Sequence, residues 1–522
     1  MGSKWATALA ALALLAAVPA AAQVTEASVT GGKVQGAAVG ELGEFKGIPF
    51  AAPPVGDLRW KAPQPVKPWS GVKQTTHFAD ACMQSGGGGG AGKGIPYSED
   101  CLYLDVWTPA KTPGDKLPVV VWIYGGGFNA GATSNELYDG ANLAKKGVVF
   151  VAISYRVGPF GFLATPALSK ESGHGSGAYG MLDQLAGLKW VQANVAKFGG
   201  DPSKVTILGH SAGGFAVSML AASPLAKGMF RGVISESGAN FNPPQDQQTF
   251  AGSNFQSLKM AETNGQAWLD SLGAHSLAEA RALPATQVEK AQRNPGAPRF
   301  WPPVDGYVLT ADQVQLYKQR RFNDTPILVG DVSDEAAAFG RRALDPATFE
   351  AEVRKDYGRH ADAILAAYGH ASDAQATRSA TQLRSDTMFD WGQYTWARME
   401  TGYGRNKAFV YRFDKPSAQN PNGSGHGQEL AYVFGNLGIN GRAQPTDADR
   451  ALSDQMQAYW VNFVKTLDPN GPGLPQWPSF TADRPQMMRF GVDPGPAQVA
   501  NLERLKVLDG YYDWRRDGSR DR

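Results

Sequence analysis

The chain has 522 residues, of which 43% are apolar and 19% charged, so it can bury a sizeable core and is not expected to be disordered. Its 50 basic residues nearly balance its 48 acidic ones, which gives no electrostatic reason to expect nucleic acid or an anionic membrane as a partner. Glycine, with 62 residues, is more frequent than in an average protein. No Gly-X-Y period is present, so a collagen-like fold is excluded. With only two cysteines, Cys82 and Cys101, a Cys₄ metal site is excluded as well.

Residues 1–22 are predicted to be a secretory signal peptide. Lys4 precedes an apolar segment at 6–18, and Ala20–Ala22 supplies an A-x-A cleavage site. The apolar segment is too short to span a membrane, although an uncleaved anchor is the alternative. Cleavage after Ala22 leaves 23–522 as the mature chain, in the periplasm or outside the cell. The oxidising conditions there favour a disulfide between Cys82 and Cys101.

Apolar strand-like segments alternate with helical ones along the mature chain. Strands are expected at 117–124, 148–154, 205–208, 232–235, 326–329 and 408–413, because runs that are apolar on both faces are typical of buried parallel strands. Segment 179–198 has apolar residues at helical spacing. This order predicts an α/β fold with one central, mostly parallel sheet in a single domain. Segments 247–299 and 345–405 are expected to be helical insertions.

The segment Gly209–Gly213 matches the G-x-S-x-G motif, with Ser211 at its centre. A short predicted strand precedes it and a helix of small and apolar residues, 212–222, follows it. This strand–turn–helix setting is typical of a nucleophile elbow, in which the glycines permit a sharp turn. The alternative is a Gly/Ser loop that merely caps a helix.

A serine nucleophile needs a base beside it, and in this fold the chain order is serine, acid, histidine. The histidines that follow Ser211 are His275, His360, His370 and His426. The first three lie in polar helical stretches, where a solvated surface histidine is the ordinary interpretation. His426 lies in a glycine-rich loop after a strand, which is where a catalytic base is expected, although a surface-loop histidine is the alternative.

The acid is expected in the loop after strand 326–329. Asp331, Asp334 and Glu335 compete there, and the residues alone do not choose among them. The triple glycine Gly125–Gly127 follows the strand at 117–124. Glycine lets backbone N–H groups approach a developing oxyanion, and Ala212, directly after the nucleophile, offers another N–H. A flexible turn is the alternative for the triple glycine.

These segments together resemble the type-B carboxylesterase family of α/β-hydrolases, in its para-nitrobenzyl-esterase-like branch, which is related to the cholinesterases. Further matching segments lie at 45–56, 58–60, 99–104, 155–156, 161–163, 182–184, 198–202, 468–470 and 477–478. The resemblance therefore covers nearly the whole mature chain. It implies an α/β-hydrolase fold whose helical insertions form a cap around an active-site gorge.

The resemblance also implies roles for individual residues. Ser211 would be the nucleophile, His426 the general base, Glu335 the acid, and Gly126, Gly127 and Ala212 the oxyanion hole. Ser237 would be a hydrogen-bond partner of Glu335, Glu429 would organise the base loop, and Cys82–Cys101 would be the family's first disulfide. Candidate pocket residues are Phe128, His210, Phe300 and Trp301, with core packing as the alternative for the aromatic ones.

The sequence departs from the family pattern at three points. His210 stands where the family usually has glutamate, Ala336 stands where it has glycine, and the first disulfide loop lacks the tryptophan with which cholinesterases bind a quaternary ammonium. We therefore expect a serine carboxylic ester hydrolase that acts on uncharged esters and not on choline esters. It would need no cofactor and no metal. The alternatives are a non-catalytic binding or adhesion protein and an amidase or peptidase with the same triad.

The expected partner is an ester, either a small molecule or derived from a polymer. Neither nucleic acid nor a membrane span is expected, and the sequence leaves the oligomeric state open.

Overall fold

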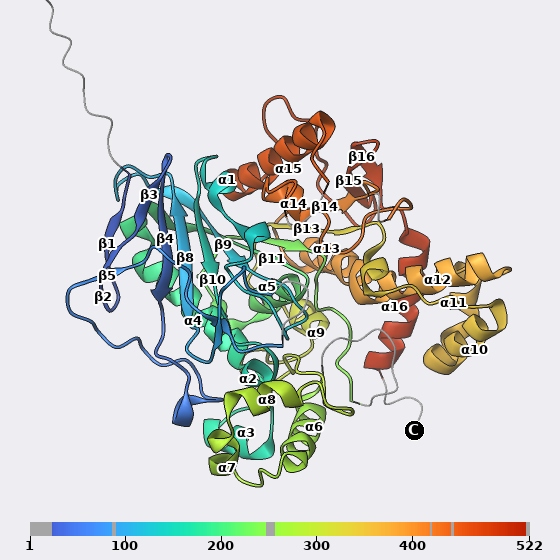
Figure 1. Cartoon of the computed structure of the whole chain (residues 1–522). Coiled ribbons are helices and arrows are strands. Elements are labelled where there is room, and N and C mark those ends of the chain that lie inside the picture. Colours follow the sequence, from blue (N-terminus) through green and yellow to red (C-terminus); the bar gives the residue numbers. More distant parts are fainter. Residues whose placement is uncertain (1–22, 86–89, 247–255, 418–419, 440–442, 518–522) are drawn as a thin grey trace, which may run out of the picture.

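The computed structural model describes residues 23–85, 90–246, 256–417, 420–439 and 443–517 (Figure 1). The predicted signal peptide therefore lies outside the described residues. The main sheet has eleven strands: β3 (Ala37–Val39), β4 (Leu42–Pro49), β8 (Tyr103–Thr108), β9 (Leu117–Ile123), β10 (Val149–Ile153), β11 (Gly200–His210), β12 (Gly232–Glu236), β13 (Ile327–Val332), β14 (Ala408–Phe413), β15 (Gln486–Phe490) and β16 (Gly495–Gln498). They lie side by side in the order β16-β15-β14-β13-β12-β11-β9-β10-β8-β4-β3.

The middle of the sheet consists of the six strands that the apolar runs predict. From β10 through β9, β11, β12 and β13 to β14, every neighbouring pair is parallel. All residues of β10, β12, β13 and β14 are buried, because helices cover both faces. The prediction of an α/β fold with a central, mostly parallel sheet is confirmed. Strand β11 is longer than the expected 205–208, with a register irregularity between Gly200 and Val205.

The edges of the sheet are antiparallel, which the sequence did not lead us to expect. Strand β8 pairs antiparallel with both β4 and β10, and β16 pairs antiparallel with β15. Charged residues such as Glu44, Lys46 and Asp105 interrupt the apolar pattern there. Asp105 is nevertheless buried and accepts a hydrogen bond from the backbone N–H of Gly47 at 2.8 Å. A separate sheet is formed by β1 (Glu26–Val29), β2 (Gly32–Gln35) and β5 (Val72–Gln74).

Helices cover the two faces of the main sheet. The helices that contact its strands are α1 (Ala141–Ala144), α4 (Tyr179–Asn194), α5 (Ala212–Ala222), α13 (Trp391–Tyr403) and α15 (Asp447–Thr466). The other helices outside the two insertions are α2 (Gly158–Phe162), α3 (Pro166–Ser172), α9 (Gln313–Lys318), α14 (Leu430–Val433) and α16 (Leu502–Arg516). In β14, Tyr411 packs against Trp460 of α15, whereas the next residue, Arg412, points to the opposite face and contacts Asp390. Successive side chains of a strand alternate in this way, so both faces of β14 are buried.

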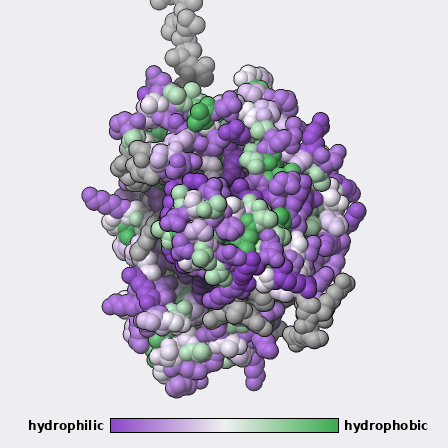
Figure 2. Space-filling model, turned by 90° about the vertical axis from the view of Figure 1, so that its right-hand side faces the viewer, coloured by the Kyte–Doolittle hydropathy of each residue, from purple (hydrophilic) through white to green (hydrophobic). Residues whose placement is uncertain are grey.

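The two segments expected to be helical insertions contain short helices. The first holds α6 (Leu258–Ser271), α7 (Leu277–Ala282) and α8 (Ala285–Ala291), at the bottom of Figure 1. The second holds α10 (Pro346–Tyr357), α11 (Ala361–Ala367) and α12 (Asp373–Ser385), at the right, followed by a π-helical turn, Asp386–Asp390, that leads into α13. Figure 2 faces the side of the molecule that carries α10–α12, and this side is mainly hydrophilic. Within the described residues, no helix combines the length and the apolar character that a membrane crossing requires.

Candidate active site

Ser211 lies at the tight turn between the end of β11 and the start of α5. Its backbone has φ 56° and ψ −121°, a conformation that costs a non-glycine residue about 1–3 kcal/mol. Two backbone hydrogen bonds hold it there. The Ser211 N–H donates to the Glu236 carbonyl, and the Ser211 carbonyl accepts from the Phe215 N–H, both at 2.8 Å. The turn therefore holds the serine side chain at the C-terminal end of the sheet.

The two glycines of the motif are required by close backbone approach. A Cβ atom on Gly213 would lie 2.0 Å from the carbonyl oxygen of Ile123 in β9. A Cβ atom on Gly209 would lie 2.2 Å from the carbonyl oxygen of Gly213. Any larger residue would push α5 away from the sheet, so these positions allow only glycine without a backbone shift.

His426 bridges Ser211 and Glu335. Its Nε2 lies 2.7 Å from the Ser211 Oγ, and its Nδ1 lies 2.5 Å from Glu335 Oε2. A carboxylate accepts hydrogen bonds, so Nδ1 carries the proton and Nε2 is free to accept one from the serine hydroxyl. Glu335 is fully buried, and its other oxygen accepts the N–H of Val332 at 3.0 Å. This arrangement can move a proton from Ser211 to His426.

The structure distinguishes the three competing carboxylates after β13. Asp331 pairs with Arg412 at 2.9 Å and not with His426. Asp334 binds Arg341 and accepts from Asn420 at 2.9 Å. Glu335, at the start of a 3₁₀ turn, is the one that reaches the imidazole.

The base loop that carries His426 is tied to the loop that carries Glu335. The Asp334 N–H donates to the Ser424 carbonyl, and the Ser424 N–H donates to the Ser333 Oγ, both at 2.9 Å. The Gly425 N–H donates to the Gln428 side chain at 3.1 Å. Base and acid are thus held in register by backbone contacts as well as by their own hydrogen bond.

The glycine loop after β9 lies against the nucleophile. A Cβ atom on Gly125 would be 2.9 Å from the Ser211 Cβ. The carbonyl of Gly126 accepts from the N–H groups of Asn129 and Ala130, both at 3.1 Å, and the carbonyl of Gly127 accepts from the Asn129 amide at 2.7 Å. Both carbonyls are therefore engaged inside the loop. Among the described residues, no acceptor engages the N–H groups of Gly126 and Gly127, or that of Ala212 at the first position of α5.

The candidate pocket residues fall into two groups. Phe128 and Trp301 pack edge to face, and Trp301 continues onto Phe215 of α5. Phe300 instead packs against Trp268 of α6 and is 3% exposed, so it belongs to the core under that helix. Phe128 is fully buried as well.

Sequence reasoning missed an aromatic row beside the base. Phe389 and Phe339 lie with their ring centroids 4.7 and 5.2 Å from that of His426, and Phe215 lies 6.1 Å from Phe389. The sequence could have indicated two of them, because each lies close to a candidate catalytic residue. Phe215 follows Ser211 by four residues, and Phe339 follows Glu335 by four. Phe389, in the π-helical turn, gives no such signal.

A cavity of about 900 Å³ lies between the two helical insertions. Two of its lining residues are chain neighbours of site residues: Ala336 follows Glu335, and Met388 precedes Phe389. Its lining combines apolar side chains with charged ones, among them Trp268, Leu344, Phe349, Arg299, Glu352 and Arg384. Ser211, His426 and Glu335 are not part of that lining, so the cavity lies beside the segments that carry Glu335 and Phe389 and does not enclose the reacting atoms.

The expected partner of Ser237 needs a correction. The Ser237 hydroxyl donates to Glu429 Oε1 at 3.3 Å, and the hydrogen bonds of Glu335 go to Val332 and His426 instead. Ser237 follows the end of β12 and Glu429 lies in the base loop, so this contact joins the sheet to that loop. The expectation failed because Ser237 and Glu335 are matched only by the resemblance, not by any local spacing.

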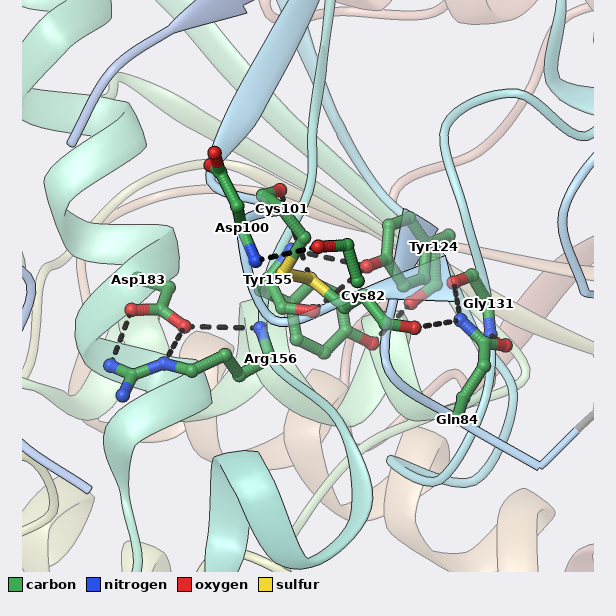
Figure 3. The surroundings of a disulfide bond; sticks show 10 residues. Cys82, Gln84, Asp100, Cys101, Tyr124, Gly131, Tyr155, Arg156 and Asp183 are labelled. Atoms are coloured by element: carbon green, nitrogen blue, oxygen red, sulfur yellow. Dashed lines mark hydrogen bonds and ion pairs between the residues drawn. A yellow bond between two sulfur atoms is a disulfide. The ribbon is translucent and has the colours of Figure 1, made fainter. Parts of the chain in front are cut away.

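The cysteines form the expected disulfide, in buried surroundings shown in Figure 3. The strands β6 (Ala81–Cys82) and β7 (Tyr97–Ser98) pair next to it. The Gln84 amide donates to the Cys82 carbonyl at 2.9 Å and to the Gly131 carbonyl at 2.8 Å, and it accepts from the Gly131 N–H at 2.8 Å. Gln84, which sequence reasoning missed, thus fastens the disulfide loop to the glycine loop.

Comparison with known proteins gives a consistent result. The model of the carboxylesterase family matches residues 21–507. The fumonisin B1 esterase of Sphingopyxis macrogoltabida is 37% identical over 94% of this chain and 91% of its own. The para-nitrobenzyl esterase of Bacillus subtilis (strain 168) is 35% identical over 86% of this chain and 91% of its own. A solved para-nitrobenzyl esterase structure superposes with a TM-score of 0.82 at 31% identity, covering 93% of this chain and 99% of that one. The chain therefore belongs to the carboxylesterase family and is a carboxylic ester hydrolase with the α/β-hydrolase fold.

Proposed function

We propose that Ser211, His426 and Glu335 are the catalytic triad of this esterase. The observation that carries the proposal is the bridging position of His426, 2.7 Å from the Ser211 Oγ and 2.5 Å from Glu335. A nucleophile, a base in contact with it and an acid that orients the base are the parts that acyl transfer requires.

The reaction would run in two halves. Ser211 Oγ bonds to the ester carbonyl carbon while its proton passes to His426 Nε2. The N–H groups of Gly126, Gly127 and Ala212 stabilise the oxyanion. When the bond to the alcohol breaks, His426 returns its proton to the leaving oxygen. Water then attacks the acyl-enzyme by the same proton path, and the acid is released with Ser211 restored.

The test is hydrolysis of p-nitrophenyl acetate by the wild type and by Ser211→Ala. Removing the nucleophile should lower kcat by at least about 10⁴-fold, and Ser203→Ala, a change of a surface serine, should leave it unchanged. Equal rates for the wild type and Ser211→Ala would contradict the triad and favour a non-catalytic binding protein. Hydrolysis of p-nitroacetanilide as fast as the ester would favour an amidase.

We further propose that the preferred substrates are uncharged esters with a bulky group. The aromatic row of Phe215, Phe339 and Phe389 supports an apolar partner, and the adjoining cavity of about 900 Å³ has room for one. Relatives are named for fumonisin B1 and para-nitrobenzyl esters, which supports substrates other than choline esters. Acetylcholine and its uncharged isostere 3,3-dimethylbutyl acetate make a matched pair, and we expect the neutral ester to have the larger kcat/KM.

Export is also part of the proposal, with residues 23–522 as one catalytic domain. The Cys82–Cys101 disulfide supports an oxidising compartment, the periplasm or the medium. The intact mass of the protein recovered from its host should correspond to a chain that begins at Gln23. A mass that retains residues 1–22 would contradict cleavage after Ala22.

A further inference from the structure

His210, the residue before the nucleophile, lies in contact with the catalytic base. Its ring centroid is 4.6 Å from that of His426, and the two ring planes are inclined by 40°. A Cβ atom on Gly427 would be 3.2 Å from His210 Cε1, and one on Gly125 would be 3.3 Å from His210 Nδ1. The ring is therefore wedged between the base loop and the glycine loop, with only 5% of the residue exposed.

Glu429 faces this imidazole from the base loop. Its Oε1 lies 3.8 Å from His210 Nε2 and accepts from Ser237 at 3.3 Å. Within the described chain, neither His210 Nε2 nor Glu429 Oε2 has a hydrogen-bond partner, although both atoms are buried. Buried polar atoms are almost always paired, so an unpaired imidazole nitrogen beside a carboxyl group that itself has an unpaired oxygen points to a shared proton, either directly or through one water.

The surroundings of this pair are rich in carboxyl groups and contain no arginine or lysine paired with it among the described residues. The titratable groups that face it are His426 from the base loop, Glu236 from the end of β12, Glu335 from the turn after β13 and Tyr411 from β14. Burial, with Glu236 and Glu335 nearby, raises the pKa of Glu429 well above its ordinary value. Burial and His426 lower the pKa of His210 well below its own. Both shifts favour a carboxylic acid facing a neutral imidazole.

We propose that His210 and Glu429 hold one proton between them as a net-neutral pair, and that His210 is thereby a positioning residue for His426. The proton lies either on the Glu429 carboxyl group or on His210 Nε2, and the pair has no net charge in either state. When His426 takes the proton of Ser211, it becomes a cation next to His210. A pair whose proton resides on Glu429 presents a neutral ring to that cation, and the proton shared with Glu429 fixes the position of this ring against His426.

The proposal rests on the triad proposed above and deepens it. A shared proton also explains what changes when histidine replaces the family's usual glutamate at position 210. A glutamate there would share the buried space with Glu429, and the second carboxylate could ionise beside His426. The histidine removes that charge, which agrees with the expectation of uncharged substrates.

The experiment compares substitutions of His210 in the assay with p-nitrophenyl acetate. His210→Phe keeps a ring but cannot exchange the proton, so kcat should fall by about 10- to 100-fold with KM within about threefold. His210→Gln can still accept a hydrogen bond from Glu429 and should recover most of this loss. His174→Phe, a change of a histidine stacked on Tyr307 away from the site, is the matched control.

The pH profile separates this role from mere packing. His210→Glu adds a negative charge beside the base, which stabilises the protonated form of His426. The acid limb of the kcat/KM profile should therefore move to higher pH by about one unit. The burst of p-nitrophenol counts correctly folded sites, so a misfolded variant is recognised by its lost burst. Wild-type kcat and pH profiles for both His210→Phe and His210→Glu would overturn the proposal. The triad proposal would survive that result, because it depends on Ser211→Ala alone.

Discussion

Two clusters of buried carboxyl groups flank the C-terminal ends of the central strands, and they differ in what neutralises them. The arginine cluster consists of Asp331, Asp386, Asp390, Arg412 and Arg504. The proton cluster consists of Glu236, Glu429 and His210. In the first, guanidinium groups supply the positive charge, whereas in the second no arginine or lysine of the described chain does so.

The arginine cluster fixes a wall of the active site. Arg412 Nη1 contacts Asp331 at 2.9 Å and Asp390 at 3.1 Å, and Arg504 donates to Asp386 at 2.6 Å. Asn501, before α16, donates to both Asp386 and Asp390. These contacts hold the π-helical turn that carries Phe389 next to His426. The C-terminal helix is thus connected to the aromatic row.

The proton cluster lies on the nucleophile side of the base. Burial raises the pKa of Glu236 to about 8, although its Oε1 accepts the Trp460 indole N–H at 2.7 Å. Burial also raises the pKa of Glu429. A guanidinium stays charged at any pH of interest, but a carboxyl proton can move. Burial raises the pKa of Asp331 and Asp390 as well, but there Arg412 acts in the opposite direction. The comparison teaches that one cluster keeps a fixed cation among its carboxyl groups, whereas the other keeps its charge low through bound protons.

Breaking the arginine cluster should have the largest effect on stability. Arg412→Met leaves Asp331 and Asp390 buried without their cation, so the free energy of unfolding should fall by about 3–5 kcal/mol in a urea titration. Arg405→Met is the matched control, because Arg405 pairs with Asp324 at the surface and its side chain is 89% exposed. A loss below about 1 kcal/mol for Arg412→Met would show that the cluster is not a structural tie.

The proton cluster should respond to pH through Glu236. With a pKa of about 8, folded Glu236 keeps its proton between about pH 4.5 and 8, whereas the unfolded chain loses it near its ordinary value. The wild type therefore loses stability as pH rises through this window. Residue 236 of Glu236→Gln cannot titrate. As pH rises, the free energy of unfolding of this variant should therefore increase relative to that of the wild type by up to about 1.4 kcal/mol per pH unit. Glu41→Gln, at the surface, should leave the slope unchanged, and an equal slope for Glu236→Gln would contradict the assignment.

Removing one hydrogen bond from the arginine cluster should cost less. The Tyr368 hydroxyl donates to Asp386 at 2.6 Å, and both groups are buried. Tyr368→Phe should lower the free energy of unfolding by about 1.5 kcal/mol, because Asp386 keeps its contacts with Asn501 and Arg504. Tyr97→Phe, at an exposed tyrosine, is the control in the same titration. A cost as large as that of Arg412→Met would mean that the hydroxyl, not the guanidinium, organises the cluster.

The sequence was sufficient for the centre of the molecule. Buried parallel strands are continuous apolar runs, and Ser211 is flagged by its glycines and by the strand and helix on either side. The residues left Asp331, Asp334 and Glu335 unresolved as the acid, and only the family resemblance chose Glu335. All three lie within five positions, and which one reaches His426 depends on how a loop 91 residues away folds back.

The two clusters themselves were not predictable. Glu236, Asp386 and Asp390 are charged residues, which a sequence reader places at the surface because they are rarely buried. Their burial depends on packing between elements far apart in the chain, such as β14 with the π-helical turn and α16. The antiparallel edge strands were missed for a related reason, since Asp105 interrupts an apolar pattern yet lies buried.

The smallest expected effect is that of salt on the free energy of unfolding, which should differ between the exposed and the buried ion pairs. Exposed charges farther apart than about 8–10 Å are screened at ordinary ionic strength, and even close exposed pairs weaken in strong salt. Arg405→Met should cost no more than about 0.5 kcal/mol at 0.1 M NaCl and nothing measurable at 1 M. The penalty of Arg412→Met should be the same at both concentrations, because ions do not enter the space that Asp331 and Asp390 share with this arginine. A penalty for Arg412→Met that shrinks with salt would mean that solvent reaches the cluster, and the contrast with the proton cluster would then lose its physical basis.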